Sequence, residues 1–99
     1  MEKVPKCRLT VLKCCFDREL KETYVSDPDY GPCPYFQKDM HFVSDGSRPE
    51  NFGCGIGWRS IEQEVRAMCL PEPHFKQQVV CCNDGIRPVL FLLEQEDLQ

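Results

Sequence analysis

The sequence predicts a small α+β domain in which an antiparallel or mixed sheet of three to four strands packs against two helices. Three observations favour this class. The chain has 99 residues, the length of one domain, and 41% of them are hydrophobic. Stretches with the alternation of a strand lie near both ends of the chain, and two stretches with helix-start signals lie between them. We therefore expect residues 1–99 to form a single domain with an ordered core from about 6 to 95, with a small half-open barrel as the alternative.

The N-terminal half contains two candidate strands and a short helix. Residues 6–12 alternate between apolar and polar side chains, as a half-buried strand does. Asp17 is a suitable N-cap for a helix that ends near residue 25. Residues 41–44 form the second strand, which a turn signal ends.

The clearest helix pattern in the sequence runs over residues 60–70. Ile61 and Val65 are spaced to lie on one apolar face. Ser60 with Gln63 three residues later matches a capping box, which predicts that the helix begins at this serine.

A β-hairpin is predicted at the C-terminus. Residues 78–82 and 87–93 have the composition of strands, and the turn-forming residues 83–86 join them. A loop of this length places Pro88 opposite Cys81, at a position where proline does not need to donate a hydrogen bond.

Charge and hydropathy exclude several classes of partner. The net charge is −4 and the basic residues are scattered, which disfavours nucleic acid and acidic membrane surfaces. The N-terminal residues lack the apolar core of a secretory signal, and no apolar run is long enough to span a bilayer. We therefore expect a cytoplasmic protein whose eight cysteines are reduced thiols.

The cysteines are the first candidates for chemistry, because zinc and iron sites are built from thiolates and imidazoles. The chain has no Cys-x-x-Cys pair, so a metal site must be assembled from distant segments. The candidate metal ligands lie at loops and strand ends, with two histidines as further candidates: Cys33, Cys54, Cys81, Cys82, His41 and His74. Adjacent side chains on a strand point to opposite faces, which predicts that only one thiol of Cys81-Cys82 faces the core. Packing of the thiols as small buried hydrophobic side chains is the alternative.

Two further residues are candidates for binding a ligand. Arg87 near the hairpin turn suits an anion, or an ion pair with Asp84. Trp58 suits an apolar pocket, or the core itself. Cys33 is a candidate reactive thiol, but no base adjacent in sequence forms a catalytic pair with it, so we assign no catalytic residue and favour a protein that is not an enzyme. The glycines of Gly53–Gly57 favour a flexible turn over a phosphate loop.

Two motifs carry a resemblance to a known family. They are Gly31-Pro32-Cys33-Pro34, followed by Phe36, and Cys81-Cys82-Asn83-Asp84-Gly85-Ile86-Arg87-Pro88-Val89, with Phe52-Gly53-Cys54 between them ahead of Trp58. Over residues 6–95 the chain resembles an uncharacterised family of small prokaryotic proteins of about this length, known mainly from anaerobes. The resemblance implies one domain and matches Cys33, Cys54, Cys81 and Cys82 to the family's cysteines. It implies no activity, because the family has none established, and the family is bulkier at Gly53–Gly57.

Three functions stay open from the sequence. The first is an accessory protein that binds a metal, zinc or iron, or uses its thiols. The second is a non-catalytic interaction or assembly module, with a homo-oligomer or another protein as partner. The third is a small-molecule-binding protein or an enzyme with a reactive Cys33.

Overall fold

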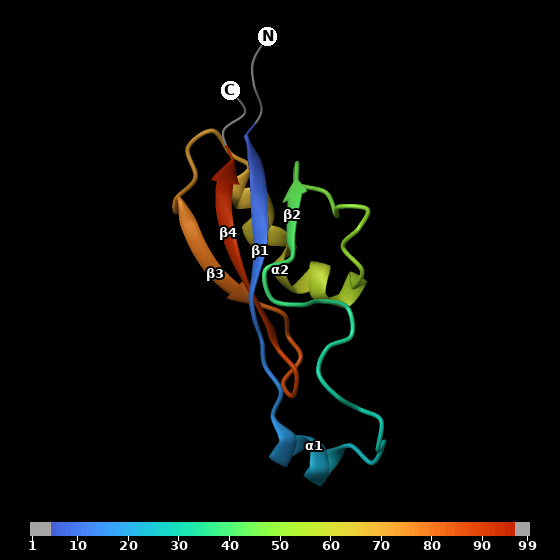
Figure 1. The fold of residues 1–99 in the computed structure, drawn as a ribbon. Coiled ribbons are helices and arrows are strands. Elements are labelled where there is room, and N and C mark those ends of the chain that lie inside the picture. Colours follow the sequence, from blue (N-terminus) through green and yellow to red (C-terminus); the bar gives the residue numbers. More distant parts are fainter. Residues whose placement is uncertain (1–4, 97–99) are drawn as a thin grey trace.

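The computed structural model describes residues 5–96 and has an open four-stranded sheet with two helices (Figure 1). The strand order in the sheet is β2-β1-β4-β3, and each neighbouring pair is antiparallel. The predicted α+β class is therefore confirmed. The elements are β1 (Lys6–Cys14), α1 (Arg18–Tyr24), β2 (His41–Ser44), α2 (Gly55–Met68), β3 (Gln77–Cys81) and β4 (Val89–Glu96).

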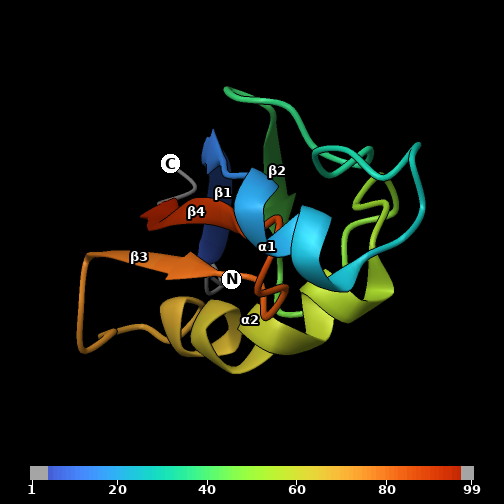
Figure 2. The same ribbon diagram turned by 90° about the horizontal axis from the view of Figure 1, so that it is seen from below.

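The core lies between one face of the sheet and α2. Alternate residues of β1 and β4 are buried on this face, as the period of two requires. The buried side chains of α2 lie at helical spacing and meet them: Trp58, Ile61, Val65 and Met68. Figure 2 shows α2 along one side of the sheet.

An aromatic cluster joins the irregular segments to this core. Phe52 is fully buried, and its ring centroid lies 4.9 Å from that of Phe36 and 5.1 Å from that of Phe42. Phe36 and Phe52 belong to the coils on either side of β2. Their burial therefore holds both coils against the sheet, and with them the nearby Cys33 and Cys54.

The helix α2 begins five residues before the predicted start. Cys54 is its N-cap, and the Cys54 Sγ accepts a hydrogen bond from the backbone N–H of Gly57 at 3.3 Å. The predicted capping box at Ser60 is wrong, since the Ser60 hydroxyl lies inside the helix and donates to the Gly57 carbonyl. Burial of Trp58 in the first turn outweighs the low helix propensity of the preceding glycines. The prediction of a flexible turn at Gly53–Gly57 is wrong from Gly55 onward, because burial of Trp58 makes these residues the first turn of α2.

The hairpin has a longer loop than predicted. Cys81 pairs with Leu90, and so the predicted position of Pro88 opposite Cys81 is wrong. The Asp84 carboxylate accepts a hydrogen bond at 2.9 Å from the backbone N–H of Arg87. This side-chain cap stabilises an extended turn and moves the first residue of β4 beyond the proline.

The short helix α1 forms where the sequence predicts it. Asp17 is the N-cap and accepts a hydrogen bond from the Leu20 backbone N–H at 3.0 Å. None of its residues is buried, and Figure 1 shows it beyond one end of the sheet. Within residues 5–96, neither helix combines the length and apolarity that crossing a bilayer requires.

Candidate functional site

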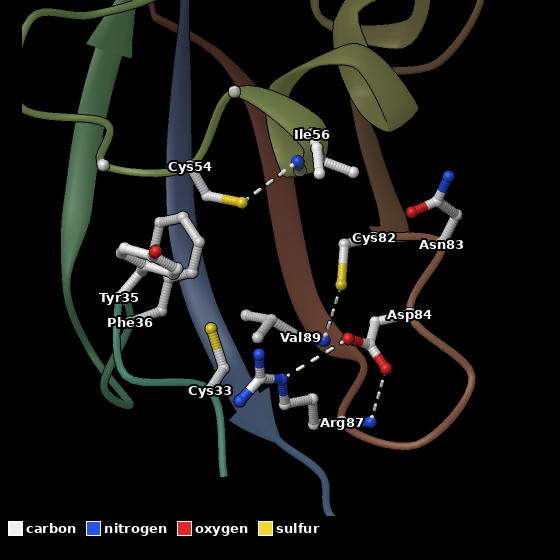
Figure 3. Close-up of a pocket in the computed structure, with 13 residues that line it drawn as sticks. Cys33, Tyr35, Phe36, Cys54, Ile56, Cys82, Asn83, Asp84, Arg87 and Val89 are labelled. Carbon is white, nitrogen blue, oxygen red and sulfur yellow. Dashed lines mark hydrogen bonds and ion pairs between the residues drawn. The ribbon is translucent and has the colours of Figure 1, made fainter. Parts of the chain in front are cut away.

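A pocket of about 370 Å³ opens between the start of α2, the coil before β2 and the loop between β3 and β4 (Figure 3). Three of the predicted ligand residues line it: Cys33, Cys54 and Cys82. Arg87 and Asp84 line it as well. The pocket therefore collects four of the eight predicted site residues, from three segments that are distant along the chain.

Each of the three thiols is positioned by a different local structure. Cys54 is the N-cap of α2, Cys82 directly follows β3, and Cys33 lies in the coil between α1 and β2. In Figure 3 their side chains project toward the same space. The Cys82 Sγ accepts a hydrogen bond from the Val89 N–H at 3.3 Å, much as the Cys54 Sγ accepts from Gly57. Hydrogen bonds of this kind also support thiolates that bind metals or clusters.

Arg87 ties two walls of the pocket together. Its Nη1 donates to the Gly31 carbonyl at 3.3 Å, and its guanidinium carbon lies 4.2 Å from the centroid of the Tyr30 ring. Its Nε also lies 3.4 Å from the Asp84 carboxylate. These contacts join the hairpin loop to the coil that carries Cys33, and so they hold Cys33 on the same side of the sheet as Cys82.

Asp84 stays a carboxylate in this setting. Burial acts to raise its pKa, but the hydrogen bonds from the backbone N–H groups of Arg87 and Ile86 and the Arg87 side chain outweigh that effect. The pKa of Asp84 therefore lies below its ordinary value. The charge on this wall is a compensated ion pair rather than a lone negative group.

A fourth thiol lies close behind the pocket and was missed from the sequence. Burial raises the pKa of Cys14, and the neighbouring thiols of Cys33, Cys15 and Cys82 raise it further. The Cys14 thiol donates to the Phe36 carbonyl at 3.4 Å. Cys14 pairs with Val89 across the sheet, and the Cys82 N–H donates to the carbonyl of the same valine. The pairing of β1 with β4 is what brings Cys14 close to Cys82. The sequence of either strand alone does not predict this pairing.

Four of the predicted residues do not line the pocket. Cys81 is exposed on the opposite face of β3, as the alternation of strand residues predicts. His41 is exposed on β2, and His74 is exposed and lies against the ring of Phe75. Trp58 is buried in the core, with its indole N–H donating to Glu62 at 3.2 Å. Its role here is packing of α2.

The three pocket thiols are not arranged as a finished coordination shell. Among residues 5–96, no group of three or more His, Cys, Asp or Glu side chains is placed to hold a metal ion. The metal site therefore stays a prediction. Outside the pocket, Cys7 is a packing residue: it is fully buried, and burial raises its pKa to about 12.

Comparisons of the chain with protein-family models, with curated proteins and with solved structures find no match in any of the three. The resemblance to the family of small prokaryotic proteins therefore also stays a prediction.

Proposed function

We propose that this protein binds a soft metal ion, zinc in the first instance, through Cys33, Cys54 and Cys82. The observation that carries the proposal is that three thiols from three separate segments line one pocket. Soft thiolate ligands select ions such as zinc and iron–sulfur clusters over hard cations. The chain supplies no comparable gathering of carboxylates there, since Asp84 is already paired with Arg87.

Coordination requires the three thiols to move closer together. Sulfur atoms that share a tetrahedral zinc lie about 4 Å apart, which follows from zinc–sulfur bonds of about 2.3 Å. Cys54 and Cys82 lie at the ends of regular elements, whereas Cys33 lies in coil. Movement of the Cys33 coil toward the other two thiols is therefore the simplest route to the bound state. A three-thiol site leaves one position for water or for a ligand from another molecule.

Gly57 keeps the wall between two of these thiols open. A Cβ atom at this position would lie 3.4 Å from the Cys54 Sγ and 4.0 Å from the Cys82 Cβ. These are contacts that a folded chain tolerates. Gly57→Ala therefore preserves all three thiols while narrowing the space between two of them.

The test is a zinc titration of anaerobically purified, reduced protein, with a competing chromophoric chelator. We expect one zinc per chain, and at least a tenfold loss of affinity in each of Cys33→Ser, Cys54→Ser and Cys82→Ser. Cys81→Ser is the matched control, because that thiol is exposed on the other face of the sheet, and it should leave the affinity unchanged. Absence of zinc binding by the wild type, or an equal loss in Cys81→Ser, would refute the proposal. Iron content of the purified protein, measured in the same samples, decides between the two metals.

A second candidate function is binding of a small anionic molecule. It is favoured by Arg87 on the pocket wall beside Cys33 and by the volume of about 370 Å³, within the range of about 300–1,000 Å³ for ligand sites. The measurement is the rate of Cys33 alkylation with and without a small phosphate ester or carboxylate. Protection that disappears in Arg87→Ala but persists in the exposed control Arg59→Ala would support it. The lack of any protection by either anion would count against it.

A further inference from the structure

The sheet has a second face, which no described helix covers. The inner face packs on α2, and Figure 2 shows the opposite side without a helix of residues 5–96 along it. Because strand residues alternate between faces, the outward side chains near the middle of the sheet can be assigned. Six of them form what we term the open face: Thr10, Leu12, Val43, Val79, Leu90 and Leu92.

The apolar members of the open face come from all four strands, and polar side chains lie between them: Val43 pairs with Arg8, Thr10 pairs with His41, and Leu90 pairs with Lys13. Five of its six members are valine or leucine, and Val43 and Val79 are 41% and 57% exposed. Single exposed apolar residues are ordinary on protein surfaces, but Val79, Leu90 and Leu92 are neighbours on two paired strands, and such a group marks a contact site. We propose that the open face is the contact surface of a homodimer of this chain.

The charged residues around the open face make it complementary to itself. At the end of the sheet near the chain termini, β1 carries the basic residues Lys6 and Arg8, and β4 carries the acidic residues Glu94 and Glu96. Within one chain Arg8 already lies 3.6 Å from Glu96. Positive and negative groups therefore stand side by side on neighbouring strands.

A two-fold axis that runs parallel to the strands, over the open face and between β1 and β4, brings these opposite charges of the two copies together. It lays β1 of each copy over β4 of the other, so Arg8 of one copy meets Glu94 of the second, and Thr10 meets Leu92. An axis perpendicular to the strands would instead place the charged end over the other copy's opposite end. The charge pattern thus selects a second copy as the occupant, in one orientation.

The size of the face fits a reversible dimer. Four strands about 4.8 Å apart and on average about 22 Å long present roughly 420 Å² of projected area per copy. Two copies then bury on the order of 840 Å², which lies in the range of weak, transient interfaces below about 1,200 Å². We therefore expect a dissociation constant in the micromolar range. The thiol pocket lies on the α2 side, so the dimer leaves it open and does not depend on the proposed metal.

The test is sedimentation equilibrium of the reduced full chain over a wide concentration range. The wild type should be a dimer at high concentration, and Leu92→Lys and Val79→Lys should each raise the dissociation constant at least about tenfold. Tyr24→Lys is the matched control, because Tyr24 is 75% exposed on α1, away from the open face, and it should leave the constant unchanged. Circular dichroism checks that each variant folds; Val79 is exposed enough for its variant to retain the fold even if Leu92→Lys does not.

Charge reversal tests the orientation. Arg8→Glu should weaken the dimer, because it places two acidic side chains against each other, and the double variant with Glu94→Arg should restore it. A wild type that stays monomeric at the highest concentration would overturn the proposal and leave the face to a different partner. A dimer that persists in both lysine variants would overturn it too, since another surface would then hold the copies together.

Discussion

Replacement of Phe52 by alanine tests whether the aromatic cluster holds the thiol pocket in place. Phe52 is fully buried, and the ring centroids of Phe36, Phe42, Trp58 and Phe91 lie 4.9–5.7 Å from its own. Truncation of a core phenylalanine to alanine costs about 3–5 kcal/mol, because apolar contacts are lost and a cavity remains. Each aromatic pair adds about 0.5–1.5 kcal/mol beyond simple burial, which places this site in the upper part of that range.

This loss is large beside the whole free energy of unfolding. A domain of this length is stable by roughly 5–15 kcal/mol, so Phe52→Ala is expected to remove about a quarter of it or more. Urea unfolding in reducing buffer measures the change. Phe75→Ala is the control, because Phe75 is 54% exposed, and it should cost less than about 1 kcal/mol. Phe52→Leu, at about 1–2 kcal/mol, retains a folded protein if the alanine variant does not.

The same variants report on the site. Phe52 precedes the N-cap of α2 by two residues, so a looser cluster should let Cys54 react with iodoacetamide faster while exposed Cys81 reacts as before. A Phe52→Ala variant that loses less than 1 kcal/mol, or that keeps Cys54 as slow as in the wild type, would refute the view that this cluster positions the pocket.

Three further predictions follow from single residues. Burial raises the pKa of Cys7 from 9.0 to about 12. Because the unfolded chain therefore releases this proton at a lower pH than the folded chain, the free energy of unfolding of the wild type should fall by up to about 4 kcal/mol between pH 9 and pH 12. That part of the fall is absent in Cys7→Ala, and urea unfolding across this pH range measures the difference. Asp17→Ala should cost α1 about 1 kcal/mol and speed hydrogen exchange of its amides, while global unfolding is unchanged because α1 buries no residue; a shift in the global urea midpoint would contradict this. Gly57→Ala should stabilise α2 by up to about 1 kcal/mol and weaken zinc binding in the chelator assay, whereas Gly85→Ala, whose Cβ meets nothing within 4 Å, should leave zinc binding unchanged.

The sequence predicts correctly those elements that depend on contacts between residues close together in the chain. The Asp17 cap, the short strand at residues 41–44 and the apolar spacing of Ile61 and Val65 each act within a few residues of the chain, and the structure confirms them. The start of α2 and the length of the hairpin loop depend on distant contacts. Burial of Trp58 decides the first and the Asp84 cap the second, and neither outcome follows from propensity.

The candidate site divides in the same way. The sequence predicts a group of Cys33, Cys54 and one thiol of the Cys81-Cys82 pair from their places at loops and strand ends, and Cys33, Cys54 and Cys82 do line one pocket. Cys14 was missed because its neighbours come from the pairing of β1 with β4, which has no signal within either strand. His41 and His74 were named for their chemistry alone, and the topology places neither in the pocket.

The central pairing of β1 with β4 also determines when this chain is able to fold. Of the four described strands, β1 is synthesised first and its main partner β4 is synthesised last. During synthesis β1 has only the four-residue β2 to pair with, which is too little to hold an apolar strand in water. The nascent chain therefore gains its native sheet only after β4 has left the ribosome. Contacts of such long range are the ones that slow folding, and in this interval the unpaired apolar strands depend on dilution or chaperones to avoid aggregation.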